Sequence, residues 1–115
     1  MEVTVENDAR EGGDARDFAS AVADFRRTVE TYAPRLAEMS DGAASRRLGG
    51  EESWSAKQIV GHLIDSAANN HRRFVLAQSK DDLVFDGYAQ EDWVRAQRYD
   101  AEPWPQIVEL WRAYN

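Results

Sequence analysis

The chain has 115 residues, of which 43% are hydrophobic and four are tryptophan, so it is long enough for one folded domain and too short for two. Its formal net charge of −7 has the wrong sign for a protein held to phosphate backbones, and we expect no nucleic-acid partner. Cysteine is absent, which excludes disulfides and Cys-based zinc sites.

Residues 1–13 show no sustained apolar period and end in Gly12-Gly13, so we expect a flexible acidic leader before a helical domain over residues 14–115. The start of the chain has neither the basic nor the apolar region of a signal peptide, and no apolar run is long enough to span a bilayer. We therefore expect a cytoplasmic protein without a membrane partner.

Over residues 14–39, apolar residues recur at alternating steps of four and three, which predicts a long helix with one buried face. These residues are Phe18, Val22, Phe25, Val29, Tyr32, Leu36 and Met39. Pro34 interrupts the backbone hydrogen bonds, but the pattern keeps its phase on both sides of it, so we favour a kinked continuous helix over a break. Residues 40–53 are rich in turn formers, which predicts a connection with one helical turn.

A second helix is predicted over residues 55–78. Ser55 followed by Gln58 fits a capping box, and Trp54 precedes the cap as a hydrophobic staple would. At about 100° per residue the apolar positions span one broad arc, which we expect to be buried; they are Ile59, Val60, Leu63, Ile64, Ala67, Phe74 and Val75. A polar stripe follows one edge of this arc and consists of Ser55, His62, Ser66, Asn69 and Arg73.

The two histidines of the chain lie on different faces of this helix. His71 falls inside the apolar arc, so we expect it to be a core residue satisfied by one hydrogen bond and more buried than His62. Nine residues separate the two, which is about 180° around the helix axis and about 13 Å along it. They therefore cannot share one metal ion.

Residues 79–102 are a long polar connection with aromatic residues and a short helix from Gln90 to Gln97, which either anchors itself to the bundle or covers a pocket for a small molecule. A third main helix is predicted over residues 103–115, with proline tolerated in its first turn. The fold class is therefore all-α, an up-and-down bundle whose main helices pack near antiparallel. We expect the incompletely covered apolar face of helix 103–115 to mediate a homo-oligomer such as a dimer.

The pattern Trp54-Ser55, three residues, Ile59, two residues, His62-Leu63, one residue, Asp65 stands in the predicted second helix. It resembles the second helix of the DinB-like superfamily of bacterial four-helix-bundle proteins. The resemblance extends over nearly the whole chain after the leader, through residues 67–74, Phe85-Asp86-Gly87-Tyr88, Trp93, Pro103-Trp104 and residues 110–115. The chain departs from the pattern at Ala67, where many relatives carry glutamate.

The resemblance implies a divalent metal ion, zinc or nickel, held by a histidine of the second helix, which His62 matches. It also implies two further histidines, spaced His-x-x-x-His, on a fourth helix. The chain ends at Asn115 before such a helix, so we expect this chain alone to bind metal weakly or not at all. Four further residues are predicted to support the ligand or line its pocket: Asp65, Ser66, Asn69 and Asn70.

The function implied by the resemblance is that of a metal-dependent hydrolase or a low-molecular-weight-thiol transferase, in which the metal activates water or a thiol by lowering its pKa. Asp65 either orients the imidazole of His62 or makes an ordinary surface hydrogen bond with it. The alternative is a non-catalytic helical module for structure or interaction, in which the polar stripe is structural. A contact with DNA is opposed by the negative charge.

Overall fold

The computed structural model describes residues 14–115, so the predicted leader, residues 1–13, lies outside the described residues. The described chain is helical and contains no β-strand, which confirms the all-α fold class. Its elements are α1 (Asp14–Ala37), α2 (Asp41–Ser45), α3 (Ala56–Ala77), α4 (Gln90–Gln97), the 3₁₀ turn η1 (Tyr99–Ala101) and α5 (Trp104–Tyr114). Within this part of the chain, no helix combines the length and apolar character that crossing a membrane requires.

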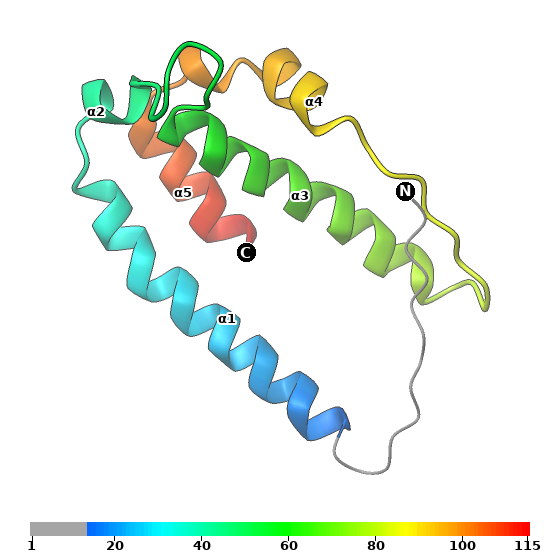
Figure 1. Ribbon diagram of the computed structural model, residues 1–115. Helices are drawn as coiled ribbons and strands as arrows, with labels where there is room; N and C mark the ends of the chain where they lie inside the picture. The colour runs from blue at the N-terminus through cyan, green and yellow to red at the C-terminus, as the bar shows by residue number, and fades with distance from the viewer. Residues whose placement is uncertain (1–13) are drawn as a thin grey trace.

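Helix α5 packs against both α1 and α3. Figure 1 shows α1 and α3 approaching each other near α2 and diverging toward the other end, with α5 between them. The turn η1 and helix α4 pack on α3. The short helix α5 is therefore the central element of the core.

Trp104 is the most completely buried aromatic residue of the core, with an exposed fraction of 0%. Its indole Nε1 donates a hydrogen bond of 2.7 Å to the carbonyl oxygen of Leu36, which connects the start of α5 to the end of α1. The buried apolar cluster draws on all the helices and consists of Val29, Ala33, Ala44, Ala56, Val60, Ile64, Val94, Tyr99, Trp104, Ile107, Val108 and Trp111.

Helix α1 continues through Pro34, as predicted, but its apolar face is buried only near its C-terminal end. Val29 and Ala33 belong to the core, whereas Phe18 is 72% exposed and Phe25 is 49% exposed. The prediction of one buried face is therefore wrong for the N-terminal half of the helix. The physical reason is length: the 11 residues of α5 extend only about 16 Å at 1.5 Å per residue, too short to cover a 24-residue helix.

Helix α3 begins with the predicted capping box. The Ser55 hydroxyl accepts a hydrogen bond from the Gln58 amide at 3.3 Å, and the Gln58 side chain accepts one from the Ser55 amide at 3.0 Å. The predicted apolar arc, however, is only partly buried. Val60 and Ile64 lie in the core, but several other members are exposed, because none of the helices within residues 14–115 packs over the strip they occupy: Ile59, Leu63, Phe74 and Val75.

The short helix predicted from Gln90 to Gln97 is confirmed as α4. It leads into η1 through Arg98, which adopts a left-handed backbone conformation with φ of 54°. The ring of Tyr99 then lies against Gly61 of α3, where an added Cβ would approach the ring to within 2.2 Å. Glycine at this position is what allows η1 to approach α3 so closely.

Candidate functional site

His62 lies in the second turn of α3 and is half buried. Its Nδ1 atom is buried and has no hydrogen-bond partner among the described residues. The ring of Trp54 packs beside the imidazole, with a centroid separation of 5.4 Å and an angle of 46° between the rings. The residue that precedes the helix cap therefore limits the positions open to the imidazole.

Asp65 lies one turn further along α3 and is completely buried. Its Oδ1 accepts a hydrogen bond of 2.6 Å from the Tyr99 hydroxyl and one of 3.0 Å from Nε2 of Gln97. Its other oxygen, Oδ2, is buried without a partner among the described residues. The hypothesis of an ordinary surface hydrogen bond to His62 is wrong, because the carboxylate is at 0% exposure and bonds to α4 and η1 instead.

The pKa of the Tyr99 hydroxyl is raised in this environment. Burial is the first cause that raises the pKa of its hydroxyl, and the hydrogen bond to Asp65 is the second. The phenol therefore stays protonated and keeps donating to Asp65 across the physiological pH range.

Two other predicted site residues, Ser66 and Asn69, make hydrogen bonds that hold the chain in place. The Ser66 hydroxyl is 2.6 Å from the Tyr88 hydroxyl. Asn69 donates a hydrogen bond of 2.9 Å to the backbone oxygen of Asp65 in its own helix. Further along the stripe, Arg73 donates a hydrogen bond of 3.0 Å to the backbone oxygen of Asp86. Two residues of the polar stripe, Ser66 and Arg73, therefore anchor the connection between α3 and α4.

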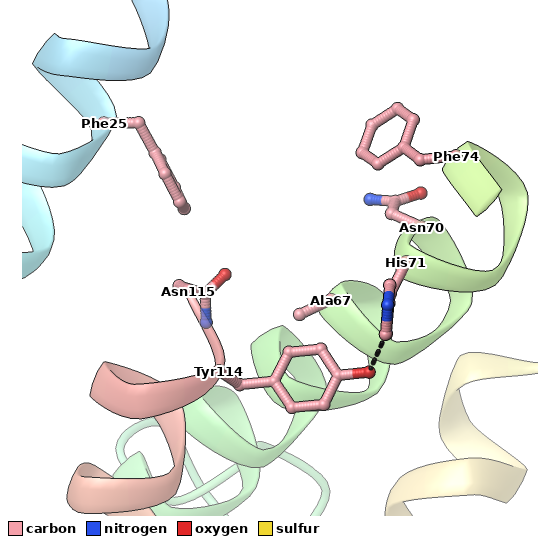
Figure 2. Close-up of a pocket in the computed structure, with 7 residues that line it drawn as sticks. All are labelled: Phe25, Ala67, Asn70, His71, Phe74, Tyr114 and Asn115. Atoms are coloured by element: carbon pink, nitrogen blue, oxygen red, sulfur yellow. Dashed lines mark hydrogen bonds between the residues drawn. The ribbon is translucent and has the colours of Figure 1, made fainter. Parts of the chain in front are cut away.

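Asn70 lies on a different face, where it lines an open groove of about 550 Å³ at the diverging ends of α1 and α3. Figure 2 shows this groove with Phe25 of α1 on one side and the α3 residues on the other. Its walls are mainly apolar, and its residues are Phe25, Ala67, Asn70, His71, Phe74, Tyr114 and Asn115. The sequence patterns indicated the apolar faces that form it but not that they would remain open.

His71 lies in this groove and is exposed, so the prediction that it is a core residue more buried than His62 is wrong. The single hydrogen bond expected for it is present, since its Nδ1 lies 2.9 Å from the Tyr114 hydroxyl (Figure 2). The two rings also meet edge to face, with centroids 5.7 Å apart. His71 is exposed because α5 ends beside it and no other described helix covers its face of α3.

A second, more polar groove of about 630 Å³ lies between the start of α3 and α4. Trp54 lines this groove and also packs against the imidazole of His62. Three arginines and three acidic residues line its walls: Arg47, Arg95, Arg98, Glu52, Glu91 and Asp100. Sequence patterns do not indicate this groove, because its charged residues come from the connection between α2 and α3, from α4 and from the turn after α4.

Residues 14–115 contain no group of three histidine, cysteine or acidic side chains positioned to hold a metal ion. A catalytic zinc site needs about three protein ligands converging on one point. Of the two histidines, one lies beside Trp54 and the other lies in the apolar groove. The described residues therefore supply one candidate ligand, His62, and not a complete metal site.

Comparison with known proteins finds two relatives. The chain is 30% identical over 73 residues to a protein of Oceanobacillus iheyensis named "putative metal-dependent hydrolase", a match that covers 61% of this chain and 42% of that protein. It is 32% identical over 50 residues to a protein of Halalkalibacterium halodurans with the same descriptive name, covering 44% of this chain and 29% of the relative. The chain thus spans less than half the length of these curated relatives. No family model and no solved structure matches the chain.

Proposed function

We propose that this chain is the His62-bearing part of a metal-dependent hydrolase of the DinB-like class, with a divalent ion, zinc or nickel, as its cofactor. The observation that carries the proposal is the half-buried imidazole of His62, which makes no hydrogen bond to a described residue, although neighbouring stripe residues such as Ser66 are paired. Support comes from the names of the two relatives, both metal-dependent hydrolases by description. Thiol transfer is the second chemistry that the resemblance implies.

The donor set within residues 14–115 does not by itself fit a catalytic metal, since His62 has no second ligand beside it. The proposal therefore requires the remaining ligands to come from outside the described residues. No catalytic step is derived through the metal.

Metal content tests this proposal. Zinc and nickel bound per chain are measured by elemental analysis after dialysis, for the 115-residue chain and for the full product of its reading frame. We expect weak or no binding by the 115-residue chain, and one ion per chain in the full product. Absence of metal from the full product would overturn the proposal.

Two histidine variants of the full product serve as a matched pair. His62→Ala should abolish metal binding, because it removes the imidazole that the proposal makes a ligand. His71→Ala should leave the metal in place, because His71 lies in the groove and bonds Tyr114. Metal content unchanged in His62→Ala would show that the ion binds elsewhere.

A second candidate function is self-association as a helical interaction module, and the open groove favours it. Exposed apolar side chains lie on both helices that flank the groove, with Phe18 and Phe25 on α1 and Phe74 on α3. The exposed apolar surface of α1 in one copy therefore matches that of α3 in a second copy, which supports a second copy of this chain as the occupant.

A further inference from the structure

Two buried polar atoms in adjacent turns of α3 are without hydrogen-bond partners among the described residues: Nδ1 of His62 and Oδ2 of Asp65. Residues three apart are neighbours on a helix surface, with Cβ atoms about 5–6 Å apart. Buried polar atoms in folded proteins are nearly always paired, directly or through ordered water. The two atoms thus belong to neighbouring side chains and both lack a hydrogen-bond partner, and Oδ2 of Asp65 can act as an acceptor.

The carboxylate is held in a fixed orientation by the opposite oxygen. Both partners of Oδ1, the Tyr99 hydroxyl and the Gln97 amide, are donors, so Oδ1 acts as an acceptor in both bonds. Tyr99 is itself fixed against Gly61, which has no side chain to displace it. Oδ2 therefore keeps its full acceptor capacity and cannot turn toward these donors without breaking both bonds.

The imidazole is restricted on its other side. Trp54 packs beside the ring at a centroid distance of 5.4 Å, which limits rotation of His62. A neutral imidazole carries one proton, on Nδ1 or on Nε2, and the hydrogen bond made by one nitrogen decides the state of the other. An acceptor facing Nδ1 selects the tautomer with the proton on Nδ1.

We propose that Asp65 is the positioning residue for His62: its Oδ2 accepts, through one bridging water, the hydrogen bond donated by Nδ1–H, and Nε2 is left unprotonated. No direct bond joins the two side chains, and a water relays a hydrogen bond at little loss of strength. Metal-binding histidines commonly donate their second N–H to a carboxylate in this way. Any ligand role of Nε2 rests on the proposed function, but the tautomer does not.

The tautomer can be measured in the metal-free 115-residue chain by long-range ¹H–¹⁵N correlation NMR. Spectra are recorded at about pH 8.5, where imidazoles with a pKa near 6.5 are neutral. His71→Ala identifies the signals, because the chain has two histidines. We expect the proton of His62 on Nδ1, whereas an unconstrained imidazole in water favours Nε2. A proton on Nε2 in the wild-type chain would overturn the proposal by itself, whatever the variants do.

Asp65→Asn supplies the decisive variant. The amide keeps an oxygen for Tyr99 and Gln97 but presents N–H donors where Oδ2 was, which reverses the direction of the hydrogen-bond relay. We expect the His62 proton to move to Nε2. Tyr99→Phe is the matched control, because it removes a partner of Oδ1 and leaves Oδ2 in place, and we expect His62 to retain the Nδ1 proton.

Helix content measured by circular dichroism shows whether each variant is folded. A folded Asp65→Asn chain with the proton still on Nδ1 would contradict the proposal. Because these spectra contain no metal, their outcome is independent of the metal-content test. A protein with the expected tautomer but no bound metal would refute the proposed function and leave the role of Asp65 intact.

Discussion

Nζ of Lys57 lies 3.0 Å from Oδ1 of Asp41, and this ion pair joins the start of α3 to α2. The lysine side chain is only 4% exposed, whereas the aspartate side chain is 57% exposed. The same aspartate oxygen also accepts a hydrogen bond of 2.8 Å from the backbone amide of Trp104. One carboxylate therefore connects three helices and neutralises a buried ammonium group.

Asp41→Asn should lower the melting temperature at neutral pH, because it leaves the buried Lys57 without its counter-charge. Asp92→Asn is the control, since Asp92 pairs with Arg95 on the surface, where both side chains are at least 70% exposed. Thermal melts followed by circular dichroism provide the comparison. Equal effects of the two substitutions would show that the buried lysine does not depend on Asp41.

The stability contributed by Asp41 should also depend on pH. The hydrogen bond from the Trp104 amide, followed by the Lys57 side chain, lowers the pKa of Asp41 from its ordinary value of 3.8. Because the folded-state pKa is the lower one, the contribution is present above pH 3.8 and is lost as the pH falls through the folded-state pKa. Melts between neutral and strongly acidic pH should show a smaller acid loss in Asp41→Asn than in the wild-type chain.

Gly61→Ala should destabilise the fold, because the new Cβ would lie 2.2 Å from the Tyr99 ring. Overpacking of this kind costs roughly 1–3 kcal/mol, more than the roughly 1 kcal/mol gained from the helix propensity of alanine. Gly42→Ala is the matched control in α2, where an added Cβ meets nothing within 4 Å. Urea unfolding should therefore show opposite signs for the two substitutions, and a stabilised Gly61→Ala chain would contradict the packing of η1.

Trp104→Phe should lower the free energy of unfolding by roughly 1–3 kcal/mol, because the hydrogen bond to the Leu36 carbonyl is lost and a void remains in the core. Trp93→Phe serves as the comparison, since Trp93 is 36% exposed and meets Tyr88 edge to face at the surface. Denaturant titrations of both variants test the difference. A cost for Trp93→Phe as large as that for Trp104→Phe would be inconsistent with α5 as the centre of the core.

The 115-residue chain should self-associate through the open groove. Phe25→Ser and Phe74→Ser should each shift the chain toward monomer, because each removes a large apolar side chain from the surface proposed as the contact. Val84→Ser is the control, since Val84 is 69% exposed and lies outside the groove. Light scattering over a range of concentrations measures the mass, and a monodisperse wild-type monomer would rule out this interface.

Local patterns predicted the helices well. The capping box of Ser55 and Gln58 depends on atoms three residues apart, so it could be inferred without any tertiary contact. The continuity of α1 through Pro34 and the short helix from Gln90 to Gln97 were also correct, for the same reason. Assignment of His62 as a metal ligand depends on the family resemblance and stays a prediction.

Burial is what the patterns could not decide. Periodicity places Phe25 and His71 on the apolar faces of their helices, but a face is buried only where another element reaches it. Helix α5 packs in one core with Val29 of α1 and Ile64 of α3, then ends at the groove, whose wall includes Tyr114. The angular position of a side chain around its helix axis is a local property, whereas its burial depends on the length and position of a helix elsewhere in the chain.

The environment of Asp65 shows the same division. Its place three residues after His62 follows from the sequence, but its partners Tyr99 and Gln97 lie 34 and 32 residues away and meet it only when η1 and α4 pack on α3. Helix geometry sets which side chains are neighbours within about one turn. Which polar atoms find a partner, and which remain unpaired beside the imidazole, is decided by the tertiary packing that removes water from them.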